Sequence, residues 1–237
     1  VLYFPFEISI IKHVVSIMKE KNENKDICAK CGGYCCKKSG CDYAPEDFSD
    51  LSLNYLMPKL SEGYISIVSA LDLKSFPNGQ IVNIPILYLR ARNRNRPIID
   101  LLSMKTTCLS LKEDGCSFSY EDRPFGGRSL TPVVNRMCYS KVNPEEIILR
   151  WQNHQQVLAR AVKRITGKSV DEVLKKDVEN LFFDVFMQHY DGVSEREVKE
   201  ILELIPDLQQ AYPLEFKIAK SRYKTIENPN ILKRLFK

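Results

Sequence analysis

Five of the eight cysteines in this 237-residue chain lie within fourteen residues, from Cys28 to Cys41. The stretch reads C-A-K-C-G-G-Y-C-C-K-K-S-G-C, and its glycines allow the backbone to wrap around a shared ion. Such dense thiol spacing favours a metal or iron–sulfur site over core packing. All eight cysteines are candidate ligands: Cys28, Cys31, Cys35, Cys36, Cys41, Cys108, Cys116 and Cys138.

Eight thiols suffice for two four-cysteine sites, or for one cluster with spare or redox-active thiols. The adjacent side chains of Cys35 and Cys36 tend to diverge, so we expect only one of them to serve a given ion. A structural zinc takes four ligands, and an iron–sulfur cluster commonly takes three cysteines close in sequence and one remote. The spacing alone fits iron–sulfur, iron or zinc. The number of thiols slightly favours iron.

The two extended segments after residue 63 predict a β-hairpin. Tyr64–Leu71 and Ile81–Arg92 are rich in strand-forming residues, and Pro77-Asn78-Gly79 between them is a strong turn signal. Before them, helical periodicity predicts a helix over Glu7–Lys21, and Pro45 predicts the start of a helix that runs to Leu60. An Asp-Gly turn between Cys108 and Cys116 predicts two short extended pieces, as in a metal-binding knuckle.

Four arginines alternate along the end of the second strand, at Arg90, Arg92, Arg94 and Arg96. If the strand continues, its two-residue period places all four on one face. Two interpretations stay open: a contact for an anion or acidic peptide, or a charged edge that resists strand pairing. Few aromatic residues interleave with them, so the run gives no strong nucleic-acid signal.

The composition changes after Cys138, where cysteines end and glycine becomes rare. Helical periodicity predicts helices over 144–166, 169–190, 194–212 and 214–224. The expected N-terminal capping boxes are Ser169 with Glu172 and Ser194 with Glu197. The expected C-terminal helix stops are Gly167 and Gly192. Expected core residues are Trp151, Leu158, Val162 and Ile165, whereas His13, His154 and His189 are expected not to be ligands.

The fold class is therefore α+β. A cysteine-rich metal-binding part with a β-hairpin and short helices spans residues 1–140. An all-helical part spans 141–237, as a separate domain or as an extension of the same core. The hydrophobic fraction of 44% supports such a core without disulfides.

The chain shows no run of eighteen apolar residues and no recognisable export signal at its apolar start. We therefore expect no membrane span and a cytoplasmic location, where clustered cysteines more often bind metals than form disulfides. The net charge of +5 permits an acidic partner without requiring one. The sequence does not predict the oligomeric state.

The chain resembles the YkgJ-type cysteine-cluster family in a combination of motifs. The first is Cys28-x-x-Cys31-x-x-x-Cys35-Cys36, and the others come later in the sequence. These are Cys108, Cys116 and Tyr120-Glu121-x-Arg123-Pro124-x-x-x-Arg128. That family is described as a zinc- or iron-chelating domain, and the chain is more loosely similar to flagellin lysine N-methylases. The resemblance covers about residues 28–138 and adds to the preference for iron.

The resemblance also marks residues around the expected site. Where the family pattern R-P-x-x-C-R has its cysteine, this chain has Gly127. Either Cys138 replaces that ligand or one coordination position is open. Arg123 and Arg128 are expected to offset the charge of clustered thiolates, and Tyr34 and Tyr120 either shield the site or pack as ordinary aromatic residues.

Three functions follow from these features. The resemblance to the methylases implies an enzyme that modifies a protein or peptide side chain. The alternatives are a non-catalytic interaction module held together by metal, and a metal carrier or redox sensor that uses spare thiols. The sequence contains no recognisable glycine-rich nucleotide loop and no Ser/His/Asp or Cys/His constellation, so it assigns no catalytic residue.

Overall fold

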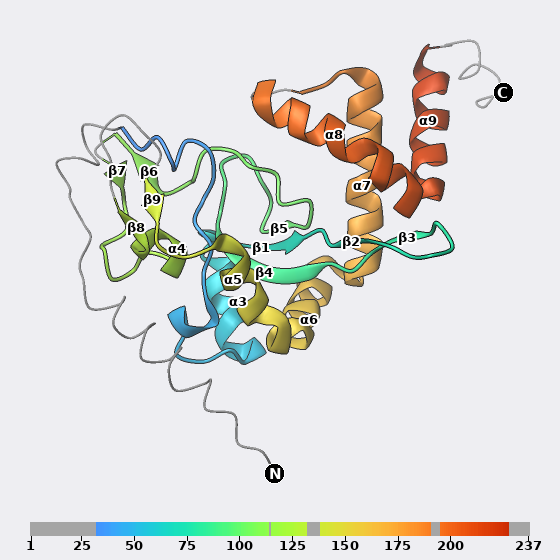
Figure 1. Cartoon of the computed structure of the whole chain (residues 1–237). Coiled ribbons are helices and arrows are strands. Elements are labelled where there is room, and N and C mark those ends of the chain that lie inside the picture. The colour runs from blue at the N-terminus through green and yellow to red at the C-terminus, as the bar shows by residue number, and fades with distance from the viewer. Residues whose placement is uncertain (1–31, 114, 132–137, 191–194, 228–237) are drawn as a thin grey trace.

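The computed structural model describes residues 32–113, 115–131, 138–190 and 195–227. Its fold is α+β, as predicted, with a small sheet followed by a helical part (Figure 1). In the main sheet, β1 (Ile65–Ala70) lies between β4 (Ile86–Ala91) and β5 (Ile99–Asp100). β4 pairs with β1 in the antiparallel sense and β5 pairs with it in parallel.

The predicted β-hairpin is confirmed, although its second strand is interrupted. The β1–β4 pair continues as a two-stranded ribbon of β2 (Leu73–Ser75) and β3 (Ile81–Asn83), which reaches away from the sheet in Figure 1. Pro85 separates β3 from β4, because proline has no N–H for a strand ladder. The turn contains Gly79, whose φ of 78° suits glycine.

The single helix predicted from Pro45 to Leu60 is wrong. A 3-10 turn, η1 (Pro45–Asp47), is followed by an extended Phe48, and α3 (Leu53–Ser61) begins only later. The carboxylate of Asp47 accepts hydrogen bonds from the N–H groups of Ala44 (2.9 Å) and Phe125 (2.7 Å), which ends the first turn. The side chain of Ser52 then caps α3, a preferred role for serine.

The helices after residue 143 largely follow the prediction, with two corrections. The segment 144–166 is three consecutive pieces: α5 (Pro144–Leu149), η2 (Arg150–His154) and α6 (Gln155–Thr166). α7 (Val170–Met187) ends at a left-handed Gln188 and so stops before Gly192. The stop at Gly167 and the Ser169–Glu172 capping box are confirmed. α8 (Glu195–Ala211) and α9 (Pro213–Glu227) complete the chain.

Two predictions concern residues outside the part of the chain that the structure describes. The helix over Glu7–Lys21 lies outside the described residues, and so does Ser194 of the second capping box. Of the helices in the described part of the chain, none has the length and apolarity needed to cross a membrane.

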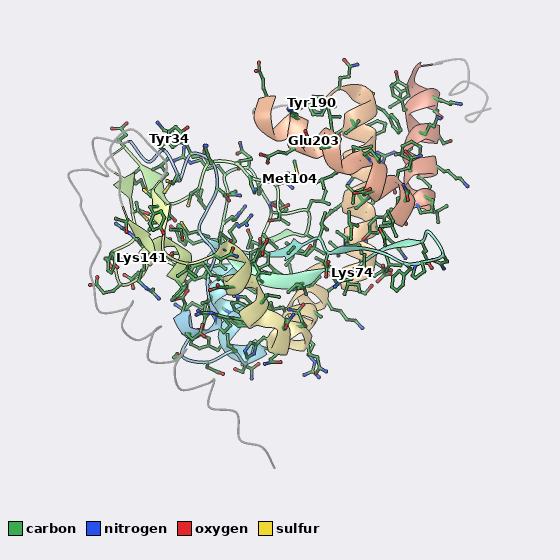
Figure 2. All side chains as sticks on the ribbon, in the orientation of Figure 1. Tyr34, Lys74, Met104, Lys141, Tyr190 and Glu203 are labelled. Atoms are coloured by element: carbon green, nitrogen blue, oxygen red, sulfur yellow. The ribbon has the colours of Figure 1, made fainter. Side chains whose placement is uncertain are left out.

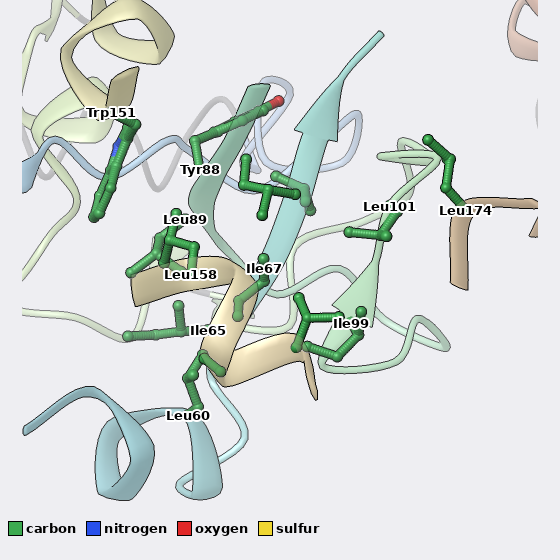
Figure 3. Close-up of a cluster of buried hydrophobic side chains, with 14 of the residues drawn as sticks. Leu60, Ile65, Ile67, Tyr88, Leu89, Ile99, Leu101, Trp151, Leu158 and Leu174 are labelled. Carbon is green, nitrogen blue, oxygen red and sulfur yellow. The ribbon is translucent and has the colours of Figure 1, made fainter. Parts of the chain in front are cut away.

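One cluster of buried side chains joins the sheet to the helical part. Figure 3 shows Ile67 and Leu89 of the sheet close to Leu158 of α6 and Trp151 of η2. The indole N–H of Trp151 donates to the carbonyl of Tyr43 at 2.8 Å, so its one polar atom is satisfied. Helices α7, α8 and α9 add further members to the same cluster.

Three of the four predicted core residues are buried. Trp151, Leu158 and Val162 are fully enclosed, whereas Ile165 in the last turn of α6 is 38% exposed and was wrongly assigned to the core. His154 packs edge-on against the ring of Trp151, at 6.0 Å between ring centroids. This contact is the packing role expected for His154.

The four arginines after residue 89 do not share one face, because β4 ends at Ala91. Arg90 is buried and pairs with Asp42. The side chain of Arg96 pairs with Asp100 at 2.6 Å. Arg92 donates to the carbonyl of Arg96 and Arg94 to that of Leu111. The guanidinium groups therefore brace the loop that follows β4, which neither sequence interpretation anticipated.

Asp177 of α7 makes the stability of the fold depend on pH. Burial, followed by the nearby carboxylate of Asp100, raises the pKa of Asp177 to about 6 from 3.8. The folded protein therefore holds a proton that the unfolded chain releases, and stability should fall as pH rises from about 4 to about 6. A two-unit shift corresponds to about 3 kcal/mol; partial exposure of the side chain reduces our expectation to about 1–2 kcal/mol.

Asp177→Asn should make this fall smaller, because asparagine does not titrate, whereas Asp47 and Asp184, whose pKa values burial also raises, still contribute to it. Urea unfolding at several pH values between 4 and 7 measures the slope. Asp171→Asn, on an exposed residue of the same helix, is the matched control and should keep the wild-type slope. An identical slope in wild type and Asp177→Asn would contradict the assignment.

Candidate cysteine site

The segment that carries Cys35 and Cys36 is a glycine-led turn. Gly32 and Gly33 have φ values of 61° and 72°, and the N–H of Lys37 donates to the carbonyl of Gly33 at 2.9 Å. A Cβ at Gly33 would lie 2.2 Å from a methyl carbon of Leu111. The turn therefore packs closely against the segment that carries the later cysteines. In Figure 1 this blue stretch passes beside β6 and β9.

Gly40 fixes the position of Cys41 against the sheet. A Cβ at Gly40 would lie 1.8 Å from the carbonyl oxygen of Ala91, and the N–H of Gly40 donates to the side chain of Asn93 at 2.6 Å. The N–H of Ala91 in turn donates to the carbonyl of Cys41 at 2.9 Å. Cys41 thus lies beside β4. Only a glycine at position 40 lets the backbone before Cys41 approach Ala91 so closely.

The second cysteine group lies beside the first, as its spacing predicted. The N–H of Cys108 donates to the carbonyl of Cys36 at 2.7 Å. β6 (Leu111–Lys112) and β7 (Gly115–Cys116) form the two extended pieces expected around the turn, with Leu111 opposite Cys116. Residues far apart in sequence are thereby held as neighbours by backbone hydrogen bonds.

Four of the thiols interact with one another. Burial, followed by negative charge on Cys108, Cys116 and Cys35, raises the pKa of Cys36 to about 12. Burial also raises the pKa of Cys41, with added contributions from Cys36, Cys108 and Cys116, and the pKa of Cys108 is raised by burial and by Cys116. Ionisation of Cys36, Cys41 and Cys108 is therefore costly, and a bound metal would offset that cost.

Cys35 has a different environment from its neighbour Cys36. The N–H of Cys138 donates to the Cys35 sulfur at 3.0 Å. The side chain of Cys138, this N–H and the charge of Lys38 together outweigh burial and lower the pKa of Cys35 to about 6. Cys138 follows the described part of β8 (Leu130–Thr131) and precedes its partner β9 (Tyr139–Ser140).

Gly127 lies beside Cys41, in a short helix. This helix is α4 (Phe125–Arg128), and a Cβ at Gly127 would be 3.5 Å from the Cys41 sulfur. Position 127 is therefore a place from which a side chain would reach Cys41. Cys138, the proposed replacement, contacts Cys35.

Of the two candidate arginines, only Arg123 acts on the thiols. Its charge lowers the pKa of Cys36, although this is the smallest of the named influences. Arg128 instead pairs with the buried carboxylate of Asp47 and donates to the carbonyl of Glu121, so its predicted role in offsetting thiolates is not supported. This Asp47 contact has no sequence signal, because Asp47 and Arg128 lie 81 positions apart.

The two candidate tyrosines also differ. Tyr120 donates from its hydroxyl to the carbonyl of Arg128 at 3.2 Å, while the Arg123 guanidinium lies 5.9 Å from its ring centroid. Tyr34 is 43% exposed, and the Lys38 ammonium lies 4.8 Å from its ring centroid. Figure 2 shows Tyr34 at the outer surface, on the side of the molecule that carries β6–β9.

The six cysteines of the described residues are all free thiols: Cys35, Cys36, Cys41, Cys108, Cys116 and Cys138. Within residues 32–113, 115–131, 138–190 and 195–227, no three His, Cys, Asp or Glu side chains are arranged to hold one metal ion. Cys28 and Cys31, two of the predicted ligands, lie outside these ranges.

Comparisons of the chain with protein-family models, with curated proteins and with solved structures find no match. The resemblance to the YkgJ-type cysteine-cluster family therefore rests on the cysteine motif and on the R-P-x-x-x-R element alone.

Proposed function

We propose that this protein binds iron, an iron–sulfur cluster or zinc through a group of thiols that includes Cys36, Cys41, Cys108 and Cys116. One observation carries the proposal: the two cysteine segments are distant in sequence, yet backbone hydrogen bonds hold them side by side, with the N–H of Cys108 donating to the carbonyl of Cys36 at 2.7 Å. Buried cysteines grouped in this way are costly to ionise unless a cation neutralises them. Cys28 and Cys31 lie a few residues before this group in sequence and are the candidates to complete the ligand set.

A bound metal would also stabilise the fold. Thiolate ligands from both segments would cross-link the turn at residues 32–41 to the β6–β7 hairpin. Few apolar contacts are available in so small a ribbon, and structural metals commonly supply the missing stability in such places. The number of thiols and the family resemblance place iron ahead of zinc.

Modification of a protein or peptide side chain is the second candidate function. The loose similarity to flagellin lysine N-methylases suggests it, and the position of Gly127 beside Cys41 favours it. Because glycine offers no ligand there, a metal held by Cys41 would lack a protein ligand from position 127. A metal with an incomplete protein ligand set supplies Lewis-acid or redox chemistry to a bound substrate.

Cys108→Ser and Cys116→Ser should each lower the metal content of the protein to less than about a tenth of the wild-type value, because structural sites need their full thiolate set. Iron, zinc and acid-labile sulfide are measured on anaerobically purified protein, together with its visible absorbance. Brown protein with iron and sulfide would identify a cluster, and colourless protein with about one or two zinc ions would identify a zinc site.

Ser117→Ala is the matched control, since it removes an exposed hydroxyl next to Cys116 and should retain the metal. Circular dichroism checks that each variant is folded. Wild-type metal content in both folded cysteine variants, or no metal in wild type purified under these conditions, would refute the proposal. Consumption of S-adenosylmethionine with a peptide substrate tests the second candidate.

A further inference from the structure

Cys35 and Cys138 form a contact of their own beside the four-thiol group. They are 103 residues apart in sequence, and the N–H of Cys138 donates to the Cys35 sulfur at 3.0 Å. Both residues are partly exposed, so a small solute in water can reach them. A backbone donor aimed at a sulfur stabilises negative charge on it. The contact thus places the backbone N–H of Cys138 within hydrogen-bonding range of the Cys35 sulfur, which brings the two cysteines together.

We propose that Cys35 and Cys138 are a redox-active pair that a low-molecular-weight disulfide, such as oxidised glutathione, converts reversibly into an intramolecular disulfide. Cys35 is the attacking residue, because its sulfur accepts the hydrogen bond. Cys138 is the resolving residue. The proposal is independent of metal binding by Cys36, Cys41, Cys108 and Cys116.

The reaction takes place in two exchange steps. The Cys35 thiolate attacks one sulfur of oxidised glutathione; the disulfide bond breaks, and one glutathione leaves as a thiolate with the electron pair. The Cys138 thiol then loses its proton to water and attacks the Cys35 sulfur. The second glutathione leaves as a thiolate. Two protein thiols have been oxidised by two electrons, and one glutathione disulfide has been reduced to two glutathione molecules.

The new bond would tie the cysteine turn to the end of the chain segment that forms β9. The Cys138 N–H bond to the Cys35 sulfur links the turn at Gly33–Lys37 to the residue that precedes β9. In Figure 1 the turn and β9 lie on the same side of the molecule, far from α8 and α9. Oxidation would therefore act on the surroundings of the candidate metal site and leave the helical part unchanged.

Peptide mapping tests the proposal directly. The full chain is incubated with oxidised glutathione, its remaining thiols are alkylated in denaturant, and it is digested with trypsin. Cleavage after Lys30, Lys37, Arg136 and Lys141 yields peptide 31–37 with Cys35 and peptide 137–141 with Cys138 as its single cysteine. We expect these two peptides to be recovered as a disulfide-linked pair, and reduced glutathione to reverse the link.

Two serine variants assign the attacking residue, since peptide 31–37 also contains Cys31 and Cys36. Cys36→Ser should retain the link and Cys35→Ser should lose it. Cys138→Ser should instead accumulate one glutathione on peptide 31–37, because the resolving thiol is absent. This trapping experiment does not require Cys35→Ser to fold.

The proposal is overturned if wild type gives no 31–37/137–141 link, if the link persists in Cys35→Ser, or if no adduct accumulates in Cys138→Ser. Metal content is measured on the same sample before and after oxidation. Retained metal supports a pair separate from the ligands, whereas loss of metal in step with the link would make Cys35 or Cys138 a ligand and refute this inference alone. Absence of metal throughout would refute the proposed function and leave the pair standing.

Discussion

Replacement of Arg90 by methionine is expected to lower the free energy of unfolding by about 3–5 kcal/mol, the cost of leaving a buried charge without its partner. Arg90 donates to Asp42 at 2.7 Å, to the hydroxyl of Ser103 at 2.6 Å and to that of Tyr88 at 2.7 Å. The side chains of Arg90 and Asp42 are only 8% and 13% exposed. Methionine preserves much of the apolar volume, so the loss reports mainly on the orphaned carboxylate.

A double-mutant cycle separates the pair from the packing. Asp42→Asn in the Arg90→Met background should recover part of the lost stability, because the uncharged amide costs less to bury. Arg94→Met is the matched control: Arg94 is exposed and donates to one carbonyl, so a loss within about 1 kcal/mol is expected. Urea unfolding measures wild type, Arg90→Met, Asp42→Asn, the double variant and Arg94→Met. Equal losses of unfolding free energy for Arg90→Met and Arg94→Met would show that the buried Arg90–Asp42 pair contributes no more to stability than the exposed Arg94 side chain.

Gly40→Ala is expected to cost more than about 3 kcal/mol, or to prevent folding, because backbone cannot yield to a new methyl group as a side chain can. The added Cβ would lie 1.8 Å from the carbonyl oxygen and 2.8 Å from the carbonyl carbon of Ala91, in the middle of the Cys41–β4 pairing. The strain would push Cys41 away from the sheet. We therefore expect the same variant to lose its metal.

Gly127→Ala is the control for this second prediction. Its Cβ would meet Arg123 and Cys41 at 3.5 Å, which is ordinary van der Waals contact, so a change within about 1 kcal/mol is expected. Thermal unfolding and the soluble yield are compared for the two variants. A melting temperature of Gly40→Ala within a few degrees of wild type would mean that the close approach to Ala91 can relax.

Features encoded by neighbouring residues could be predicted from the sequence. The hairpin follows from two strand-forming segments around Pro77–Gly79, and the start of α7 follows from the Ser169–Glu172 capping box, whose partners are three residues apart. The two short extended pieces around the turn between Cys108 and Cys116 were also predicted, from the local Asp-Gly signal.

Features that depend on distant partners could not be predicted. The helix from Pro45 failed because Asp47 binds Phe125 and Arg128, 78 and 81 residues away. The arginines were interpreted as a surface feature because nothing local marks Asp42 as the partner of Arg90, 48 positions earlier. In the same way, sequence spacing identified Cys138 as a thiol of interest but could not place it at Cys35 instead of beside Gly127.

The wide separation of Cys35 and Cys138 also sets an order of events during synthesis. At about 5–20 residues per second, the 103 residues between them take about 5–20 s to translate. The five cysteines up to Cys41 are made first, Cys108 and Cys116 follow within the interval, and Cys138 is made last. During synthesis, an incomplete set of cysteines is therefore exposed to cellular metal ions and oxidants. Metal loading that waits for the β6–β7 hairpin and Cys138 would protect against capture of the wrong ion.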